Sequence, residues 1–287
     1  MTRRGRFPAH GWMGLALIAV FWPLNWFLEG MRSHWCFFPL WLGYCLAVDG
    51  ISVYRRGSSL LTRNRWIYVS LFVISVPLWW VFEVINFRTQ NWRYVGRELV
   101  GVVEYPLLAS LSFSTVVPAV LGTAEMLAGF DFMQRFRRGP ALRPGRHTGL
   151  FFFAVGLVMF SLMMAWPRYF FPFVWLSLYF LVEPVNLWMR NRSLLEWTRE
   201  GDWRPLASLW MGVLVCGFFW EMWNFLSYPK WVYTIPGFDS WRLFEMPLPG
   251  YLGYLPFSLE LFAVVHLVLG LVGQGRSDYV SSGLMRG

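Results

Sequence analysis

The chain alternates long apolar runs with short segments that hold most of its charged residues. Eight of these runs approach the roughly 20 residues that a helix needs to cross the hydrocarbon of a membrane. They cover about 11–28, 35–54, 66–87, 102–128, 149–166, 169–189, 206–226 and 250–273. The first run follows three arginines, as in a signal peptide, but no small-x-small cleavage site follows it, so we count it as a span. The pattern predicts an all-α polytopic membrane protein with about eight transmembrane helices.

A motif that occurs twice divides these runs into two sets of four. It reads E-x-x-N-F, then W-x-Y, then E-x-P-L. The first copy contains Glu83, Asn86, Trp92, Tyr94, Glu104 and Pro106, and the second contains Glu221, Asn224, Trp231, Tyr233, Glu245 and Pro247. The offset between matched residues grows only from 138 to 141 along the motif. Identity in this order indicates an internal duplication, with four spans in each copy.

Two tandem repeats of four spans each have a defined relation. An even number of spans returns the chain to the side from which it started, so the repeats would be parallel and related by a pseudo-two-fold axis along the membrane normal. We place the first four-helix repeat at 1–129, a basic cytoplasmic linker at 130–148, the second four-helix repeat at 149–274 and a cytoplasmic tail at 275–287.

The distribution of basic residues predicts the orientation. With eight spans, 18 of the 25 Lys and Arg residues fall on the side of the two termini and seven fall on the other side. Basic residues collect on the cytoplasmic side of membrane proteins. We therefore predict a protein of a bacterial inner membrane with both termini in the cytoplasm, and with the W-x-Y and E-x-P segments on the opposite side.

The composition agrees with a membrane protein. Apolar residues make up 56% of the chain and charged residues 14%, whereas soluble domains carry about a quarter charged residues. The net charge of +9 is explained by the basic cytoplasmic segments, so we expect membrane lipid and no nucleic acid as a partner. The three Cys and four His residues show no metal-ligand spacing. We expect no metal and no cofactor.

The first pair of matched acids comes from the E-x-x-N-F segments. Glu83 and Asn86 are three residues apart and share a helix face, and the same holds for Glu221 and Asn224. An ionised carboxylate in hydrocarbon costs at least about 2.5 kcal/mol, so such groups face the bundle interior and are functional candidates. Two alternatives remain open: a structural clamp in which each Glu and Asn binds the backbone of the other half, or shallow placement near the span ends.

The second pair, Glu104 and Glu245, precedes a proline at a span entry. An acid at the positive end of a helix is a common cap, so a structural role and a site role are both open. Together with Glu83 and Glu221, this pair would place four carboxylates around a central cleft. Neighbouring like charges in a desolvated site favour a carboxylic acid that stays protonated, which is what a general acid needs.

Other acids receive structural interpretations. Asp49 and Glu183 lie near the cytoplasmic ends of their spans, close in sequence to arginines 55, 56 and 190, so an interfacial ion pair is expected. Glu125, Glu260 and His266 lie within spans and do not follow the repeat. We expect His266 to be an interior histidine with a satisfied hydrogen bond.

Aromatic residues surround the four acids of the motif. They include Trp80, Trp92 and Tyr94 in the first copy and Trp220, Trp231 and Tyr233 in the second. They are consistent with an interfacial belt and core. They are also consistent with a pocket for a long apolar ligand, in which aromatic faces stabilise a developing positive charge.

The duplicated motif resembles the membrane-integral lycopene cyclases and related carotenoid-pathway membrane proteins. The resemblance rests on Glu83, Trp92, Tyr94, Glu104 and Pro106 and on their matches in the second copy. It implies two homologous helical halves that act together, with carboxylates that drive a proton-initiated, redox-neutral ring closure. That family tends to place adjacent acids after the proline and has three-span halves, whereas here a single acid precedes the proline and each half has four predicted spans.

The leading hypothesis is an integral membrane enzyme that acts on an isoprenoid or other lipid by cyclase- or isomerase-like chemistry. Glu83 and Glu221 would be the acid/base pair, Glu104 and Glu245 would tune them, and the asparagines and aromatics would bind the substrate. A proton-coupled carrier that uses the same acids is an alternative, and so is a non-catalytic scaffold of a membrane complex.

Overall fold

The computed structural model describes residues 6–237 and 241–285, and helices dominate this part of the chain. The first half contains α1 (Ala9–Phe27), α2 (Ser33–Arg56), the short α3 (Leu60–Arg63), α4 (Arg65–Thr89), β1 (Trp92–Val95), α5 (Glu104–Phe113) and α6 (Val116–Ala128). The second contains α7 (Thr148–Ala165), α8 (Pro167–Phe170), η3 (Phe171–Trp175), α9 (Ser177–Trp188), α10 (Leu194–Arg199), α11 (Arg204–Phe225), β2 (Lys230–Tyr233) and α12 (Tyr251–Leu271). A small β3–β4 ribbon (Arg242–Leu243 and Met246–Pro247) precedes α12, and α13 (Ser281–Met285) follows it.

Six helical segments in the described residues are long and apolar enough to cross a membrane. They are Ser33–Arg56, Arg65–Thr89, Glu104–Ala128, Thr148–Ala165, Arg204–Phe225 and Leu248–Leu271. The bent pair Pro167–Trp175 and Ser177–Trp188, with a 41° angle, raises the number to seven. These helices are consistent with an integral membrane protein, but the predicted count of eight is not confirmed. The missing span is α1, a 19-residue helix whose His10, Pro23 and Asn25 interrupt its apolar sequence.

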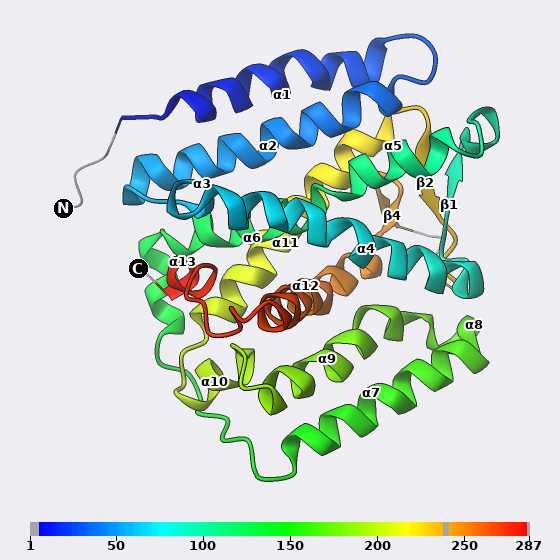
Figure 1. Cartoon of the computed structure of the whole chain (residues 1–287). Coiled ribbons are helices and arrows are strands. Elements are labelled where there is room, and N and C mark those ends of the chain that lie inside the picture. The colour runs from blue at the N-terminus through cyan, green and yellow to red at the C-terminus, as the bar shows by residue number, and fades with distance from the viewer. Residues whose placement is uncertain (1–5, 238–240, 286–287) are drawn as a thin grey trace.

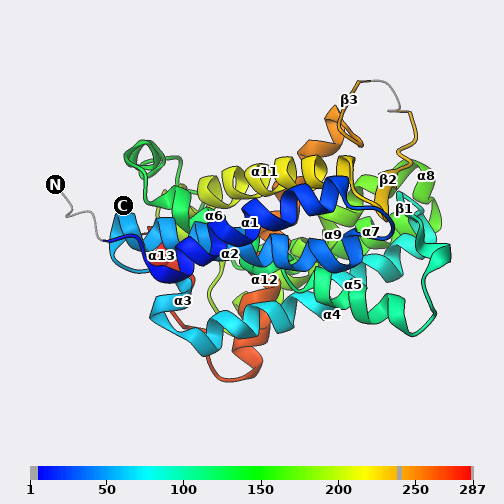
Figure 2. The same cartoon turned by 90° about the horizontal axis from the view of Figure 1, so that it is seen from above.

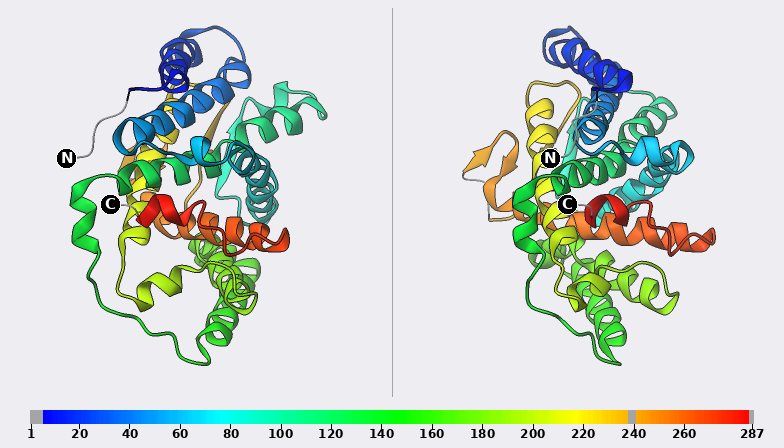
Figure 3. Two further views of the ribbon diagram at one scale, coloured as in Figure 1. Left: turned by 60° about the vertical axis from the view of Figure 1, so that its left-hand side comes forward. Right: turned by 90° about the vertical axis from the view of Figure 1, so that its left-hand side faces the viewer.

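The long helices lie side by side, with the two chain ends at one end of the bundle and the β1–β2 pair at the other (Figures 1 and 2). Helices α1 and α7 lie at opposite edges, packed mainly on α2 and α9 respectively. Helices α6 and α11 pack against each other in the middle. The views along the bundle in Figure 3 show the β3–β4 ribbon protruding from one side.

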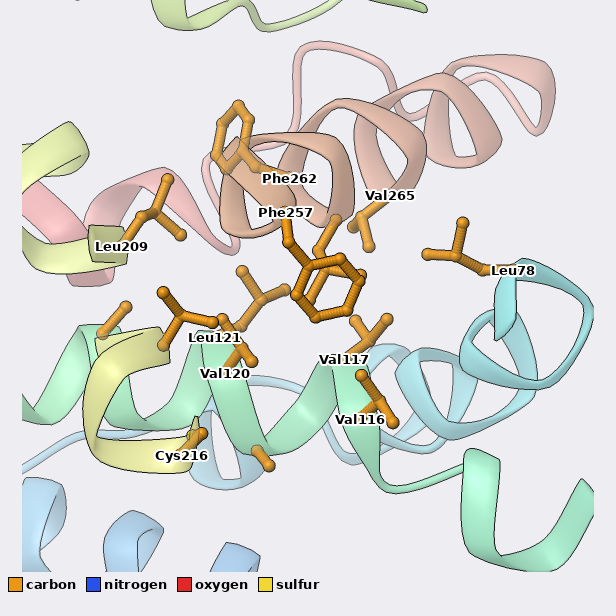
Figure 4. Packing of buried hydrophobic residues seen from close by; sticks show 14 of the residues in the cluster. Leu78, Val116, Val117, Val120, Leu121, Leu209, Cys216, Phe257, Phe262 and Val265 are labelled. Carbon is orange, nitrogen blue, oxygen red and sulfur yellow. The ribbon is translucent and has the colours of Figure 1, made fainter. Parts of the chain in front are cut away.

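The core lies where α4, α6, α11 and α12 meet. Figure 4 shows Val117 and Leu121 of α6 facing Phe257 of α12, with Leu78 of α4 and Leu209 of α11 on either side. The edge helices differ sharply, since only 17% of the α7 span is buried against 67% of the α11 span. Large apolar side chains that are exposed on α7 would be costly in water, and a lipid environment accounts for them.

The two W-x-Y segments pair with each other as antiparallel strands. Trp92 lies opposite Tyr233, Arg93 lies opposite Val232, and Tyr94 lies opposite Trp231. The register is therefore reciprocal: each Trp faces the Tyr of the other copy. Such a contact between equivalent surfaces is the kind that a two-fold relation produces.

At the end of the bundle near the termini, matched acids cap the short helices α3 and α10. Asp49 accepts hydrogen bonds from the Ser59 hydroxyl at 2.7 Å and from the Leu61 amide at 3.0 Å. Glu183 accepts from the Ser193 hydroxyl and the Leu194 amide, both at 2.7 Å. Amide groups at a helix start have no partner within the helix, so a carboxylate stabilises them.

The expected interfacial ion pair with arginine is therefore replaced by this cap at Glu183, which forms no salt bridge in the part of the chain that the structure describes. Asp49 has His10 as its ionic neighbour, with Nε2 3.0 Å from the carboxylate. Glu125 pairs with Arg63 through two hydrogen bonds of 2.5 and 2.7 Å. Buried Tyr279, Val280 and Leu284 pack the predicted tail into the bundle rather than leaving it free.

The opposite placement of the termini and the strands gives a test of topology. Native Cys36, Cys45 and Cys216 are buried and should react slowly with thiol reagents. We expect Arg93→Cys, at the exposed position of β1, to react with a membrane-impermeant maleimide in intact spheroplasts. Arg138→Cys, exposed near the terminus end, should react only after lysis, because basic segments stay in the cytoplasm. Labelling of both cysteine variants from the same side would contradict the opposite placement of the strands and the termini. Labelling of Arg138→Cys in intact spheroplasts and of Arg93→Cys only after lysis would show that the orientation is inverted.

Candidate functional site

Glu83 lies in α4, nearly two turns before the helix ends at Thr89, and its carboxylate accepts hydrogen bonds from three donors. The indole N–H groups of Trp79 and Trp92 each donate at 3.1 Å, and the Tyr94 hydroxyl donates at 2.6 Å. All three bonds end on the same oxygen, Oε1. The side chain is buried, with 8% of the residue exposed. One donor comes from the helix and two come from β1, so the carboxylate ties the strand to the helix.

Glu221 in α11 is surrounded in a similar way. The hydroxyl groups of Tyr233 and Tyr254 donate to Oε1 at 2.7 and 2.8 Å, and the Trp231 indole donates at 3.5 Å. The residue is fully buried. Trp231 and Tyr233 occupy the same places in β2 that Trp92 and Tyr94 occupy in β1. The third donor differs, since it comes from α12 instead of the preceding turn of the helix.

The asparagines three residues later hold the strands in place. Asn86 donates to the Trp92 carbonyl at 2.8 Å and accepts from the Asn91 amide at 2.9 Å. Asn224 donates to the Trp231 carbonyl at 2.7 Å and accepts from the Trp231 amide at 2.9 Å. Each asparagine thus binds the strand of its own half. The clamp exists, but it does not reach the other half as the alternative interpretation expected.

The two oxygens of each carboxyl group differ in their hydrogen bonds, because all three donors bind Oε1. Among the described residues, no donor lies within hydrogen-bonding distance of the second oxygen, Oε2, of either Glu83 or Glu221. In Glu221 this oxygen is also buried. A carboxyl oxygen without a donor is the position at which a proton can be held, because the protonated group can still accept hydrogen bonds on its other oxygen.

The tyrosines that touch these acids are hydrogen-bond donors in this structure. Burial, followed by the nearby Glu83 carboxylate, raises the pKa of Tyr94 well above its ordinary value. Burial and Glu221 raise the pKa of Tyr233 in the same way. Both phenols therefore stay protonated at neutral pH, and each keeps its hydrogen bond to the carboxyl group.

A cavity of about 150 Å³ lies against this layer of donors. Its walls contain Trp79, Trp92 and Tyr94 from one half and Trp231, Tyr233 and Tyr254 from the other. None of the four predicted catalytic carboxylates is among the lining residues. Their hydrogen-bonding partners line the cavity instead. Any proton exchanged between a carboxyl group and a ligand would therefore pass through a tyrosine hydroxyl.

A second cavity of about 210 Å³ adjoins the first. Trp92, Trp175, Tyr233 and Met246 line both cavities, and Phe171 and Ile235 line the second alone. The Trp92 and Trp175 rings are stacked, with centroids 6.0 Å apart. The two cavities thus share part of their aromatic lining beside the β1–β2 pair.

The remaining predicted residues are placed as follows. Glu104 is exposed at the start of α5, and Glu245 forms a salt bridge of 2.5 Å with Lys230. Trp220 lines the first cavity. Trp80 does not line this cavity, and its indole N–H donates to the Ser110 hydroxyl at 2.9 Å. Glu104 is thus suited to a helix cap, and Glu245 is neutralised by a cation.

Trp79 and Tyr254 belong to the aromatic residues that the sequence places around the acids, but their hydrogen bonds to Glu83 and Glu221 were not predicted. Trp79 precedes Glu83 by four residues, so helical spacing places the two side chains on one face and could have identified it. Tyr254 is 33 residues from Glu221, and no local pattern connects them. His266 is buried, and its Nδ1 lies 2.9 Å from the Phe262 carbonyl oxygen. The described residues contain no cluster of three His, Cys, Asp or Glu side chains that could hold a metal ion.

The asparagine bonds predict a stability effect. We expect Asn86→Ala or Asn224→Ala to lower the free energy of unfolding by about 1–3 kcal/mol, because buried backbone groups of the strand lose their partner. Thr89→Ala, in the last turn of α4, is a matched control, since its buried hydroxyl has no hydrogen-bond partner. Thermal unfolding in detergent measures the difference. Equal midpoints for the asparagine variants and the control would contradict the clamp.

Comparisons with known proteins add no identification. No protein-family model, no curated protein and no solved structure matches this chain. The resemblance to the lycopene cyclases therefore rests on the short motifs alone. Arguments about function start from the carboxyl groups, their donors and the two cavities.

Proposed function

We propose that the protein is a membrane enzyme that acts on an isoprenoid or other lipid by redox-neutral acid/base chemistry. The observation that carries the proposal is the carboxyl–tyrosine pair found in each half beside one aromatic cavity: Glu83 with Tyr94, and Glu221 with Tyr233. A purely structural carboxylate needs donors, but it does not need a cavity behind those donors.

The proposal includes a tandem duplication. Two parallel four-span repeats, related by a pseudo-two-fold axis, would bring the two pairs to one cavity. The reciprocal pairing of β1 and β2 supports this arrangement, and so do the matched caps at Asp49 and Glu183. In this arrangement α1 counts as the eighth span, with its polar residues turned towards the bundle, as buried Asn25 is.

In the proposed reaction, one pair donates a proton and the other removes one. The tyrosine O–H bond breaks as a C–H bond forms on a carbon–carbon double bond, and the carboxylic acid returns a proton to the phenol oxygen. A carbocation and a carboxylate result, and the cation closes a carbon–carbon bond or shifts a double bond. The second pair then takes a proton from carbon through its tyrosine as a double bond re-forms. One proton enters and one leaves, so no oxidant or reductant is needed.

The surroundings of the two pairs suit this chemistry. Aromatic faces attract cations, and Trp92, Trp175 and Trp220 line the first cavity. Their bulk also excludes water, which would otherwise capture a carbocation. A proton-coupled carrier would instead need a polar pathway from each side to the acids, and the two described cavities are mostly apolar.

The proposal predicts a separation between folding and activity. Glu83→Gln and Glu221→Gln preserve the oxygen that accepts the three donors but remove the titrating proton. We expect each to insert at wild-type levels and to lower product formation by at least about 100-fold, the usual contribution of a positioned acid or base. Mass spectrometry of lipid extracts from membranes with and without the chain measures product.

Glu98→Gln is the matched control, because Glu98 is an exposed acid in the segment that follows β1. It should leave the product level unchanged. Wild-type product levels in both Glu→Gln variants, together with destabilisation by Glu83→Ala, would show that the carboxylates only hold the strands in place.

A further inference from the structure

The first cavity is not uniformly apolar. Three basic side chains belong to its lining: His34 at the start of α2, Arg97 after β1, and Lys230 at the start of β2. Arg97 is exposed, and the other two are half-buried. The fully aromatic part lies deeper, where Trp92, Trp175 and Phe257 meet. The cavity therefore has a basic rim and an aromatic interior.

The three basic side chains differ in the salt bridges and hydrogen bonds that they form within the protein. Lys230 is paired with Glu245 at 2.5 Å and also donates to the Phe225 carbonyl at 3.1 Å. His34 lies within electrostatic range of Glu104. Arg97 has no salt bridge and no side-chain hydrogen bond with any residue that the structure describes. Its guanidinium instead lies over the Tyr105 ring, 4.4 Å from the centroid.

Two other arginines at this end of the bundle, Arg32 and Arg88, are bound to the protein. Arg32 donates to the carbonyl groups of Asn25 and Leu226, and Arg88 donates to those of Met164 and Ala165. Arg97 is thus held over an aromatic ring at the cavity rim while its donors are free for a ligand. A planar guanidinium with several donors suits a phosphate or carboxylate group.

Building on the proposed function, we propose that the cavity takes an amphiphile with a single apolar chain and a phosphate-type anionic head. Arg97 binds the head at the rim. The chain extends past Trp92 and Trp175 into the second cavity, towards Phe171 and Ile235. The positive end of the 24-residue α2, which begins at Ser33, lies at the same rim and favours the same sign of charge.

The head group explains a feature that a neutral hydrocarbon does not. An uncharged ligand gains nothing from the Arg97 guanidinium at the entrance, and it could enter in either direction. An anionic head fixes one end at the rim, so the position of each double bond relative to the Tyr94 and Tyr233 hydroxyls is defined. Orientation of this kind is a large part of what an enzyme contributes to a reaction.

The test compares three probes on the purified full chain in a neutral detergent. Farnesyl phosphate and farnesol share one chain and differ in the head, and diacyl phosphatidylglycerol carries a phosphate on two chains. Quenching of tryptophan fluorescence reports binding, because Trp92 and Trp175 line both cavities. We expect farnesyl phosphate to bind at least about tenfold more tightly than farnesol, with a preference that weakens as salt is added.

Arg97→Gln should abolish that preference and leave the affinity for farnesol unchanged. Arg93→Gln is the matched control: it is an exposed arginine four residues earlier that does not line the cavity, so it should keep the preference. Equal binding of farnesyl phosphate and farnesol by the wild type would overturn the anionic head while leaving the proposed acid/base function intact. Failure of both to bind would count against the isoprenoid substrate itself. Phosphatidylglycerol binding as tightly as farnesyl phosphate would overturn the single-chain assignment, since bulk membrane lipid would then be the source of the phosphate.

Discussion

The burial of two carboxyl groups at the same depth is the constraint on which this end of the molecule depends. A carboxylate away from water is costly unless donors compensate for the lost hydration. Glu83 and Glu221 each obtain these donors from a Trp and a Tyr of the strand that follows in sequence. The strand must therefore fold back over the helix end, and the asparagine one turn later secures its backbone.

Pairing of the strands then joins the halves. Because each strand is fixed to its own helix, antiparallel pairing of β1 with β2 sets the distance between α4 and α11. The cavities lie beside this pair and share Trp92 and Tyr233 as lining residues. The Trp and Tyr side chains that donate hydrogen bonds to the buried acids thus also line the cavity. This links the stability of the fold to the proposed chemistry.

The two ends of the bundle use acids differently. At the end near the termini, Asp49 and Glu183 cap short helices, and Glu125 is neutralised by Arg63. These carboxylates have amide, hydroxyl or guanidinium partners and no adjoining cavity lined by their donors. At the strand end the donors are phenols and indoles, and one oxygen of each carboxyl group is left without a donor. Because Oε2 of Glu183 is also buried without a hydrogen-bond partner, the two ends differ in the identity of the donors and in the cavity that Tyr94 and Tyr233 line.

The sequence by itself determined the helical class, six or seven of the predicted spans, and the matched positions of Glu83, Asn86, Glu221 and Asn224, because these follow from apolar run length and local spacing. It also placed Trp92 and Trp231 near the acids. Only the tertiary structure decided that Tyr254 reaches Glu221, that Glu245 pairs with Lys230, and that the carboxylates lie behind the cavity wall. These outcomes depend on how α11, α12 and the strands pack, and spacing along the chain carries no information about contacts between separate elements.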